Sequence, residues 1–74
     1  MDSAVERRIG QNIRNLREQA GLTQEMLSAQ LQVRGCDITR SALAKIEVGQ
    51  RHLYPDEIIH LKAILRVSFD DIFA

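Results

Sequence analysis

Hydrophobic residues recur at spacings of three and four along most of the chain, which is the period of an α-helix with one buried face. The first such stretch begins at Ser3 and ends before Gly21, a residue suited to the position that follows a helix. Its apolar positions are Val5, Ile9, Ile13, Leu16 and Ala20. No stretch alternates strictly between apolar and polar residues, as a half-buried strand does. The pattern therefore predicts an all-α chain.

Two shorter helices are predicted next, and each opens with a threonine that can accept a hydrogen bond from the first backbone N–H groups. Thr23 begins the earlier helix and Gly35 ends it. Thr39 begins the later helix and Gly49 ends it. We expect the inward-facing residues to be Met26, Leu27 and Leu31 in the earlier helix and Ala42, Leu43 and Ile46 in the later one.

A fourth helix is predicted to begin near Pro55, because proline is favoured in the first turn and Asp56 and Glu57 complement the positive end of the helix dipole. Its apolar face consists of Ile58, Leu61, Ile64 and Leu65. A final short helix is capped by Ser68, with Asp71 in its first turn. Its apolar residues are Phe69, Ile72 and Phe73. Residues 1–74 are thus expected to form one domain, a compact bundle of four main helices and a short C-terminal one.

The composition narrows the possible classes of function. One Cys and two His form no metal-ligand set, so neither a metal nor another cofactor is expected. No apolar run approaches the roughly 18–20 residues that span a bilayer, so we expect a cytoplasmic chain without a membrane partner. An enzyme is not expected either, because the sequence has no triad spacing and no Gly-rich phosphate loop. The formal net charge is zero, but eight of the ten Lys and Arg residues precede Tyr54. A local basic face is sufficient for reading DNA.

The third predicted helix exposes polar residues near its beginning. With its apolar residues turned inward, the outward positions are Arg40, Ser41, Ala44 and Lys45. A recognition helix inserts this end into the major groove, where Arg and Lys pair with guanine and Ser contacts several bases. Gln24, at the start of the preceding helix, is placed to hold a phosphate. Segment 39–51 is therefore predicted to read DNA, with a recognition helix at about 39–48.

Three blocks of sequence resemble a known family. They are Ile9-Gly10-x-x-Ile13-x-x-Leu16-Arg17 followed by Gly21-Leu22-Thr23-Gln24, then Ile38-Thr39 followed by Leu43-Ala44-Lys45-Ile46-Glu47-x-Gly49, and finally Leu61 followed by Val67-Ser68-Phe69-Asp70-Asp71-Ile72-Phe73. In this order the chain resembles the helix-turn-helix domains of the phage Cro and repressor type over roughly residues 9–73. The resemblance implies a lambda-repressor-like fold and a small bacterial or phage transcription regulator, expected to be a repressor.

The resemblance also implies a role for each matching residue. The residues expected to face the bases are Arg40, Ser41 and Lys45. Those expected to contact the DNA backbone are Thr23, Gln24, Thr39, Gln50 and Arg51. Arg17 and Glu47 are expected to form a structural ion pair between the first and third helices, and Gln24 is also a candidate to buttress a recognition side chain.

The chain departs from the family in three places: the connection of residues 32–37, the segment 50–55, which is longer than usual, and Arg66. The connection of residues 32–37 is longer than the family's tight turn, so either the second helix gains a turn or the loop bulges towards the DNA, with Arg34 as a further DNA contact. Arg66 stands where the family usually has Gly. Because a non-Gly residue in the left-handed region costs on the order of 1 kcal/mol, we expect the fourth helix to end differently.

Two readings of the function remain open. In the first, the partner is a double-stranded DNA operator bound by a homodimer, because one recognition helix reads only a few base pairs. Leu53, Tyr54 and the tail 69–73 are expected to cover the core, and their second use is a dimer surface. A regulatory protein partner is a further expectation. The alternative is a protein-interaction or antitoxin-like module that keeps the fold with little or no DNA binding, as the zero net charge suggests.

Overall fold

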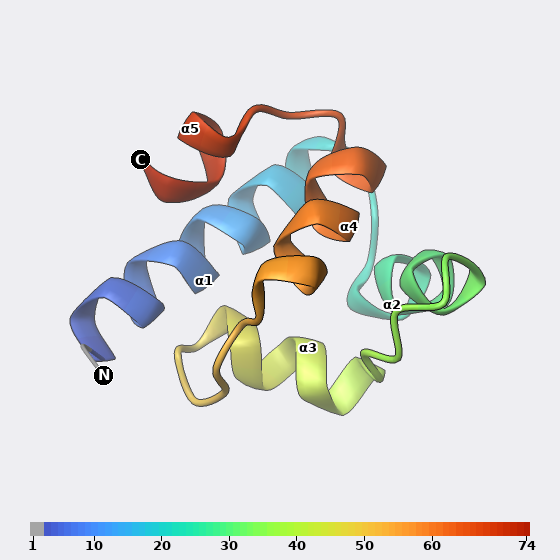
Figure 1. The fold of residues 1–74 in the computed structure, drawn as a ribbon, viewed down its shortest axis with the longest axis horizontal. Coiled ribbons are helices and arrows are strands. Elements are labelled where there is room, and N and C mark those ends of the chain that lie inside the picture. The colour runs from blue at the N-terminus through green and yellow to red at the C-terminus, as the bar shows by residue number, and fades with distance from the viewer. Residues whose placement is uncertain (1–2) are drawn as a thin grey trace.

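Regular structure in the computed structural model, which describes residues 3–74, is entirely helical. The elements in chain order are α1 (Ser3–Gln19), α2 (Gln24–Val33), α3 (Arg40–Glu47), α4 (Pro55–Leu65) and α5 (Phe69–Phe73). They pack into one bundle with extents of 30 × 22 × 20 Å (Figure 1). The all-α class and the five helices predicted from the sequence are confirmed for the described residues.

Local side-chain chemistry determines where the helices begin. The hydroxyls of Thr23 and Thr39 each accept a hydrogen bond, 3.1 Å long, from the backbone N–H three residues further on. Ser68 and Asp71 cap α5 reciprocally, with N···O distances of 3.1 and 2.9 Å. Pro55 occupies the first turn of α4, as predicted. These beginnings were predictable because each cap needs only residues that are close in sequence.

The end of α4 differs from the expectation. Arg66 adopts the left-handed conformation, with φ 57° and ψ 48°, that the family usually assigns to Gly at this position. Its backbone N–H donates to Lys62 O at 2.9 Å, which closes the last turn. The prediction that α4 would end differently is wrong, because the turn keeps its geometry and Arg66 bears a backbone cost on the order of 1 kcal/mol.

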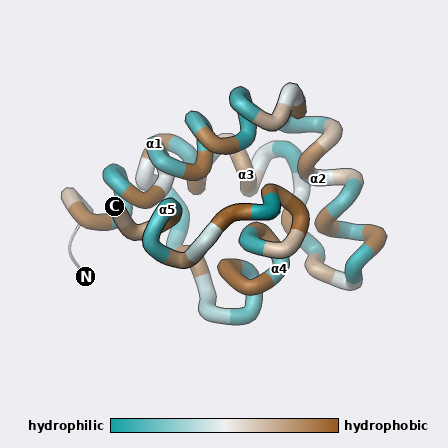
Figure 2. The backbone as a smooth tube through the Cα atoms, turned by 90° about the horizontal axis from the view of Figure 1, so that it is seen from above, coloured by the Kyte–Doolittle hydropathy of each residue, from teal (hydrophilic) through white to brown (hydrophobic). Residues whose placement is uncertain are grey.

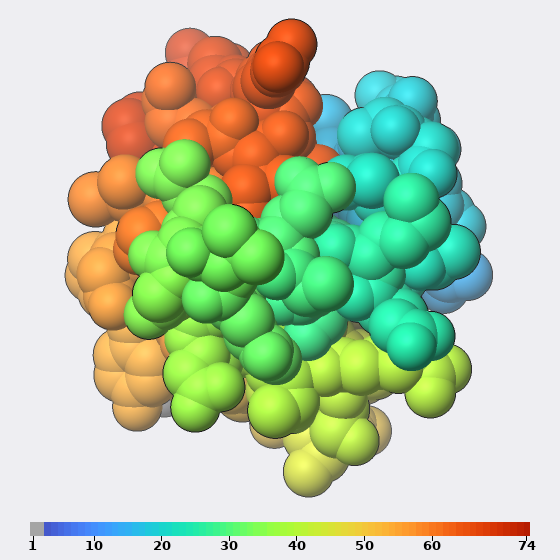
Figure 3. All heavy atoms as spheres, turned by 90° about the vertical axis from the view of Figure 1, so that its right-hand side faces the viewer, coloured from blue at the N-terminus to red at the C-terminus, as the bar shows by residue number. Residues whose placement is uncertain are grey.

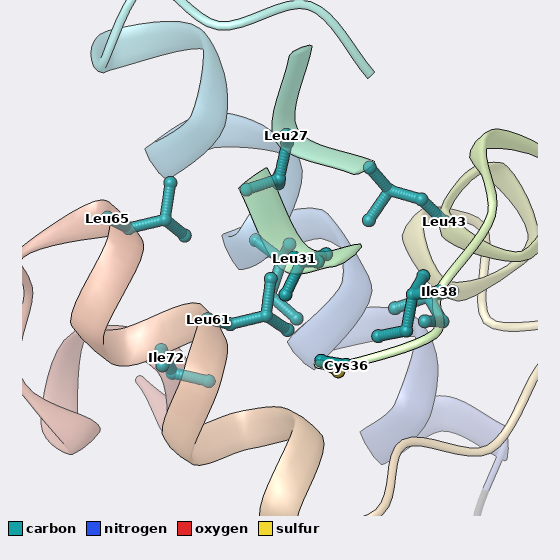
Figure 4. Close-up of a cluster of buried hydrophobic side chains, with 10 residues drawn as sticks. Leu27, Leu31, Cys36, Ile38, Leu43, Leu61, Leu65 and Ile72 are labelled. Atoms are coloured by element: carbon teal, nitrogen blue, oxygen red, sulfur yellow. The ribbon is translucent and has the colours of Figure 1, made fainter. Parts of the chain in front are cut away.

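The core lies where the five helices converge, and its side chains point toward one another in Figure 4. Its buried hydrophobic residues are Ile13, Leu27, Leu31, Cys36, Ile38, Leu43, Ile46, Leu61, Leu65 and Ile72. In Figure 2 the hydrophobic positions of the helices recur at intervals between hydrophilic ones. Helix α5 is held against α1, because the Asn12 side-chain amide donates to Ile72 O at 2.9 Å. Phe69 and Phe73, which were expected to close the core first, are each 44% exposed.

One expected core residue of α2 lies outside the core. Met26 is 46% exposed, whereas Ser28 is buried and its hydroxyl donates to Ile38 O at 2.7 Å. The helix therefore buries Leu27, Ser28 and Leu31, and Met26 falls beside this stripe. A buried serine is acceptable here because its hydroxyl has a hydrogen-bond partner.

The connection between α2 and α3 is folded back onto the core. Helix α2 runs for ten residues, and Gly35 then turns the chain with a φ of 82°. The backbone N–H of Cys36 donates to Leu31 O at 2.9 Å, and the side chains of Cys36 and Ile38 are buried. The connection therefore packs inward, with two of its side chains in the core.

Candidate nucleic-acid interface

Helix α3 rests directly on the backbone of α1. A Cβ atom added to Gly10 would lie 2.1 Å from Ile46 O, and 3.0 Å from both the carbonyl carbon and the oxygen of Glu47. Only glycine allows the two backbones to approach this closely. Gly10 therefore sets the distance between α1 and the end of α3, which fixes the axis along which α3 projects from the bundle.

A buried ion pair fixes the orientation of α3 further. Arg17 Nε and Nη2 donate to the two carboxylate oxygens of Glu47 at 2.7 and 3.0 Å, and Arg17 Nη1 donates to Leu22 O at 2.9 Å. The two side chains are only 9% and 2% exposed. The hydrogen bonds that Arg17 donates to Glu47 raise the pKa of Arg17, so the guanidinium stays charged. This is the structural pair that the resemblance implied.

Gln24 joins the same network from α2. Its side-chain amide donates from Nε2 to Glu47 Oε1 at 3.0 Å. The carboxylate of Glu47 thus accepts hydrogen bonds from both α1 and α2, while its own backbone belongs to α3. The three helices are linked by one fully hydrogen-bonded buried charge pair, the arrangement in which such a network is rigid.

The predicted base-contacting residues are exposed on the free side of α3. Arg40, Ser41 and Lys45 are all exposed, and Ala44 is half-buried. A shallow groove of about 220 Å³ lies between α2 and α3 and is lined by Gln24, Arg40, Ser41 and Ala44. Figure 3 shows α2 in green on this side of the molecule, with the beginning of α3 projecting below it. The structure therefore brings the beginnings of α2 and α3 together.

Arg51, which the sequence assigned to a DNA backbone contact, is bound to groups of the protein itself. Its Nη1 and Nη2 atoms donate to the two oxygens of Glu57 at 2.8 and 3.0 Å, and Nη1 also donates to His52 O at 2.9 Å. Glu57 also accepts a 3.0 Å hydrogen bond from the backbone N–H of Tyr54. Arg51 therefore fastens the loop after α3 to the first turn of α4. The sequence offered only a weak indication of this partner, an acidic residue in the third position of a helix.

The pair also changes the titration of its members. The hydrogen bonds that Arg51 donates to Glu57 raise the pKa of Arg51. Burial would raise the pKa of Glu57, but the hydrogen bonds from Arg51 and from the Tyr54 backbone outweigh it and lower this pKa below its ordinary value. Both groups are thus held in their charged forms, which favours the attachment of the loop after α3 to the first turn of α4.

Arg34 lies apart from the beginning of α3. Its Nε atom donates to His60 Nδ1 on α4 at 3.1 Å. It lines a different groove, with Val33 of α2 and Ile64 and Arg66 of the α4 end. Arg34 is thus turned toward α4 rather than toward the exposed side of α3. Gln50, by contrast, is exposed three residues after the end of α3, and its backbone N–H donates to Lys45 O at 2.8 Å.

The described residues contain neither a group of three or more His, Cys, Asp or Glu side chains that could hold a metal ion nor a helix long and apolar enough to cross a bilayer. The side chains exposed along and just after α3 carry guanidinium, hydroxyl, ammonium and amide donors. These are the groups that proteins use on base edges and phosphates.

Residues 13–72 match the helix-turn-helix family, and the chain belongs to that family. The Cro and repressor type indicated by the sequence is thereby confirmed. The restriction-modification controller protein C.AhdI from Aeromonas hydrophila has a similar structure, with 30% sequence identity, 96% of each chain covered and a TM-score of 0.83. The DNA-binding domain of BldD shares the fold over 100% of each chain, with 18% identity and a TM-score of 0.83. No curated protein matches the chain.

Proposed function

We propose that this chain is a sequence-specific transcription regulator that places the beginning of α3 in the major groove of double-stranded DNA. Arg40, Ser41 and Lys45 face the bases. The observation that carries the proposal is the contrast within α3, whose inner face is fixed by Gly10 and the Arg17–Glu47 pair while its outer face is polar and exposed. A rigidly held helix with free donors is what direct readout requires.

Backbone contacts on either side of α3 complete the proposed interface. Thr23 and Thr39 use a hydroxyl oxygen to accept a cap hydrogen bond, which leaves the hydroxyl proton for a phosphate oxygen. Gln24 donates one amide N–H to Glu47, and the second is available to DNA. Gln50 holds the strand beyond the end of α3. Arg51 is left out because its guanidinium is bound to Glu57, and Arg34 is left out because its side chain is bonded to His60 on α4, away from the beginning of α3.

The regulator acts as a homodimer on a two-fold operator. Its proposed dimer surface comprises exposed apolar side chains of α4, of the residue before it and of α5, namely Ile59, Tyr54, Phe69 and Phe73, which are 44–56% exposed. Beside them, Leu53, Ile58 and Phe73 line an apolar groove of about 300 Å³. Contiguous exposed apolar surface marks protein interfaces. Two recognition helices would then meet half-sites about 34–36 Å apart, and occupation of such a site in the cytoplasm represses transcription.

Selection from random DNA duplexes tests the proposal directly. We expect enrichment of a two-fold sequence, together with a solution mass of a dimer. Arg40→Ala should weaken binding to the selected operator by about 1–3 kcal/mol and relax specificity at one base position, because it removes a base-contacting side chain. The matched control is Arg34→Ala, which removes the same charge from the α4 side and should leave affinity unchanged. If no sequence is enriched, the DNA-binding proposal is wrong and the protein-interaction alternative stands.

A further inference from the structure

We propose that Arg7, at the start of α1, is a DNA-phosphate contact beyond the end of α3. This inference rests on the proposed function, since it adds a residue to the same interface. The sequence assigned the cation at this end of α3 to Arg51, whose guanidinium is instead bound to Glu57 and to His52 O. In the loop between α3 and α4, Gln50 is then left as a proposed contact that carries no charge.

The start of α1 lies against the end of α3. A Cβ atom added to Gly49 would be 2.9 Å from the Cα of Arg7 and 3.1 Å from its Cβ, so the two residues touch. Gly49 has a φ of 78° and leads directly into Gln50. Figure 1 shows the loop after α3 beside the first half of α1. The Arg7 side chain therefore leaves its helix beside the segment proposed to hold the DNA strand.

The helical register places Arg7 on the side of α1 that contacts α3. Gly10, three residues later, touches the backbone of Ile46 and Glu47, and residues three apart share a helix face. Arg17, seven residues beyond Gly10, pairs with Glu47. The row that includes Arg7 and Gly10 thus runs along α3, and Arg7 stands at its outer end.

Arg7 is also an available cation. It is exposed, and no carboxylate in residues 3–74 lies within ion-pair distance of it. Arg14 and Arg17, further along α1, each have a glutamate partner. An arginine presents a planar fork of N–H donors that matches a phosphate group. Together with the beginning of α2 at the other end of α3, Arg7 would bracket the recognition helix with backbone contacts, which set its register on the duplex.

The matched control is Arg8, an exposed arginine adjacent to Arg7 and turned by about 100° around the helix. Arg7→Ala, Arg8→Ala and Arg7→Lys would be compared with the wild type on the selected operator and on an unrelated duplex across a salt series. We expect Arg7→Ala to lower the slope of log K against log salt by about 0.9 per protomer, on both duplexes alike. Arg7→Lys should keep the wild-type slope, and Arg8→Ala should leave it unchanged.

Thermal unfolding of each variant separates a lost contact from a lost fold, because Arg7→Ala should melt with the wild type. A wild-type slope for Arg7→Ala, or an equal fall for Arg8→Ala, overturns the inference while leaving the proposed function intact. A loss restricted to the selected operator also overturns it, since phosphate contacts are independent of sequence. If the wild type itself selects no operator, the proposed function fails and the role of Arg7 fails with it.

Discussion

The two arginine–glutamate pairs of this domain have nearly the same geometry and different structural roles. Arg17 and Glu47 meet at 2.7 and 3.0 Å, and Arg51 and Glu57 meet at 2.8 and 3.0 Å. The first pair is almost wholly buried and joins two helices, whereas the side chains of the second are 27% and 11% exposed and are six residues apart. The comparison teaches that burial and sequence separation, not the hydrogen bonds themselves, determine what a pair stabilises.

Removing one partner of the buried Arg17–Glu47 pair should have the largest effect on the free energy of unfolding. Glu47→Ala leaves the guanidinium of Arg17 buried without its carboxylate and the amide of Gln24 without its acceptor. We expect the free energy of unfolding to fall by about 3–5 kcal/mol, measured by urea denaturation. The double variant Arg17→Met with Glu47→Leu should recover much of this loss, since a packed apolar pair has no unpaired charge. A loss below about 1 kcal/mol for Glu47→Ala would remove the distinction between the two pairs.

Removing the partly exposed Arg51–Glu57 pair should lower the free energy of unfolding by less and leave DNA binding intact. Arg51→Gln is expected to lower the free energy of unfolding by about 1 kcal/mol, because solvent screens the pair and a glutamine still hydrogen-bonds. Its affinity for the selected operator and the salt slope should match those of the wild type. A salt slope that falls by about 0.9 would instead show that Arg51 leaves Glu57 and contacts a phosphate.

Lowering the pH should have the smallest effect on the free energy of unfolding, and it should act through the Arg51–Glu57 pair. The pKa of Glu57 is lower in the folded chain than its ordinary value of 4.5. Its contribution to stability is therefore fully present above that ordinary value and is lost as the pH falls through the folded pKa. The difference in unfolding free energy between the wild type and Glu57→Gln should shrink over this range. If this difference stayed constant on acidification, the lowered pKa of Glu57 would be contradicted. Asp71 also has a lowered pKa, because of its hydrogen bonds with Ser68, but its contribution is the same in the wild type and the variant and cancels in the difference.

The same contrast separates what the sequence predicts from what it does not. Caps such as Thr39 and Ser68 were predictable, because their partners lie within three residues. The Arg17–Glu47 pair spans 30 residues and was accessible only through family resemblance. The partner of Arg51 depends on the path of the loop from Val48 to Tyr54, which tertiary packing sets. The burial of Met26 was predicted wrongly for a related reason. Its apolar side chain indicated burial, but Ser28 is buried in α2 instead, because its hydroxyl finds an acceptor, Ile38 O, in a segment that the sequence pattern does not place beside it.

The residues expected to face the bases were predicted from the outward positions of α3, and the structure shows that all three are exposed. The contact assigned here to Arg7 was not predictable from its position in the sequence. It depends on Gly49 lying against the first turns of α1, a juxtaposition of segments more than forty residues apart.

The inward-packed connection before α3 has a chemical consequence through Cys36. Burial, with further contributions from Glu57 and Asp56, raises the pKa of this thiol, and the thiolate is the form that reacts with alkylating reagents. The folded domain should therefore resist labelling until the connection separates from the core. Local openings require less free energy than global unfolding. The labelling rate would therefore measure how often the connection between α2 and α3 separates from the core and leaves α3 without this contact. The single cysteine of the chain thus reports how often the connection before α3 opens.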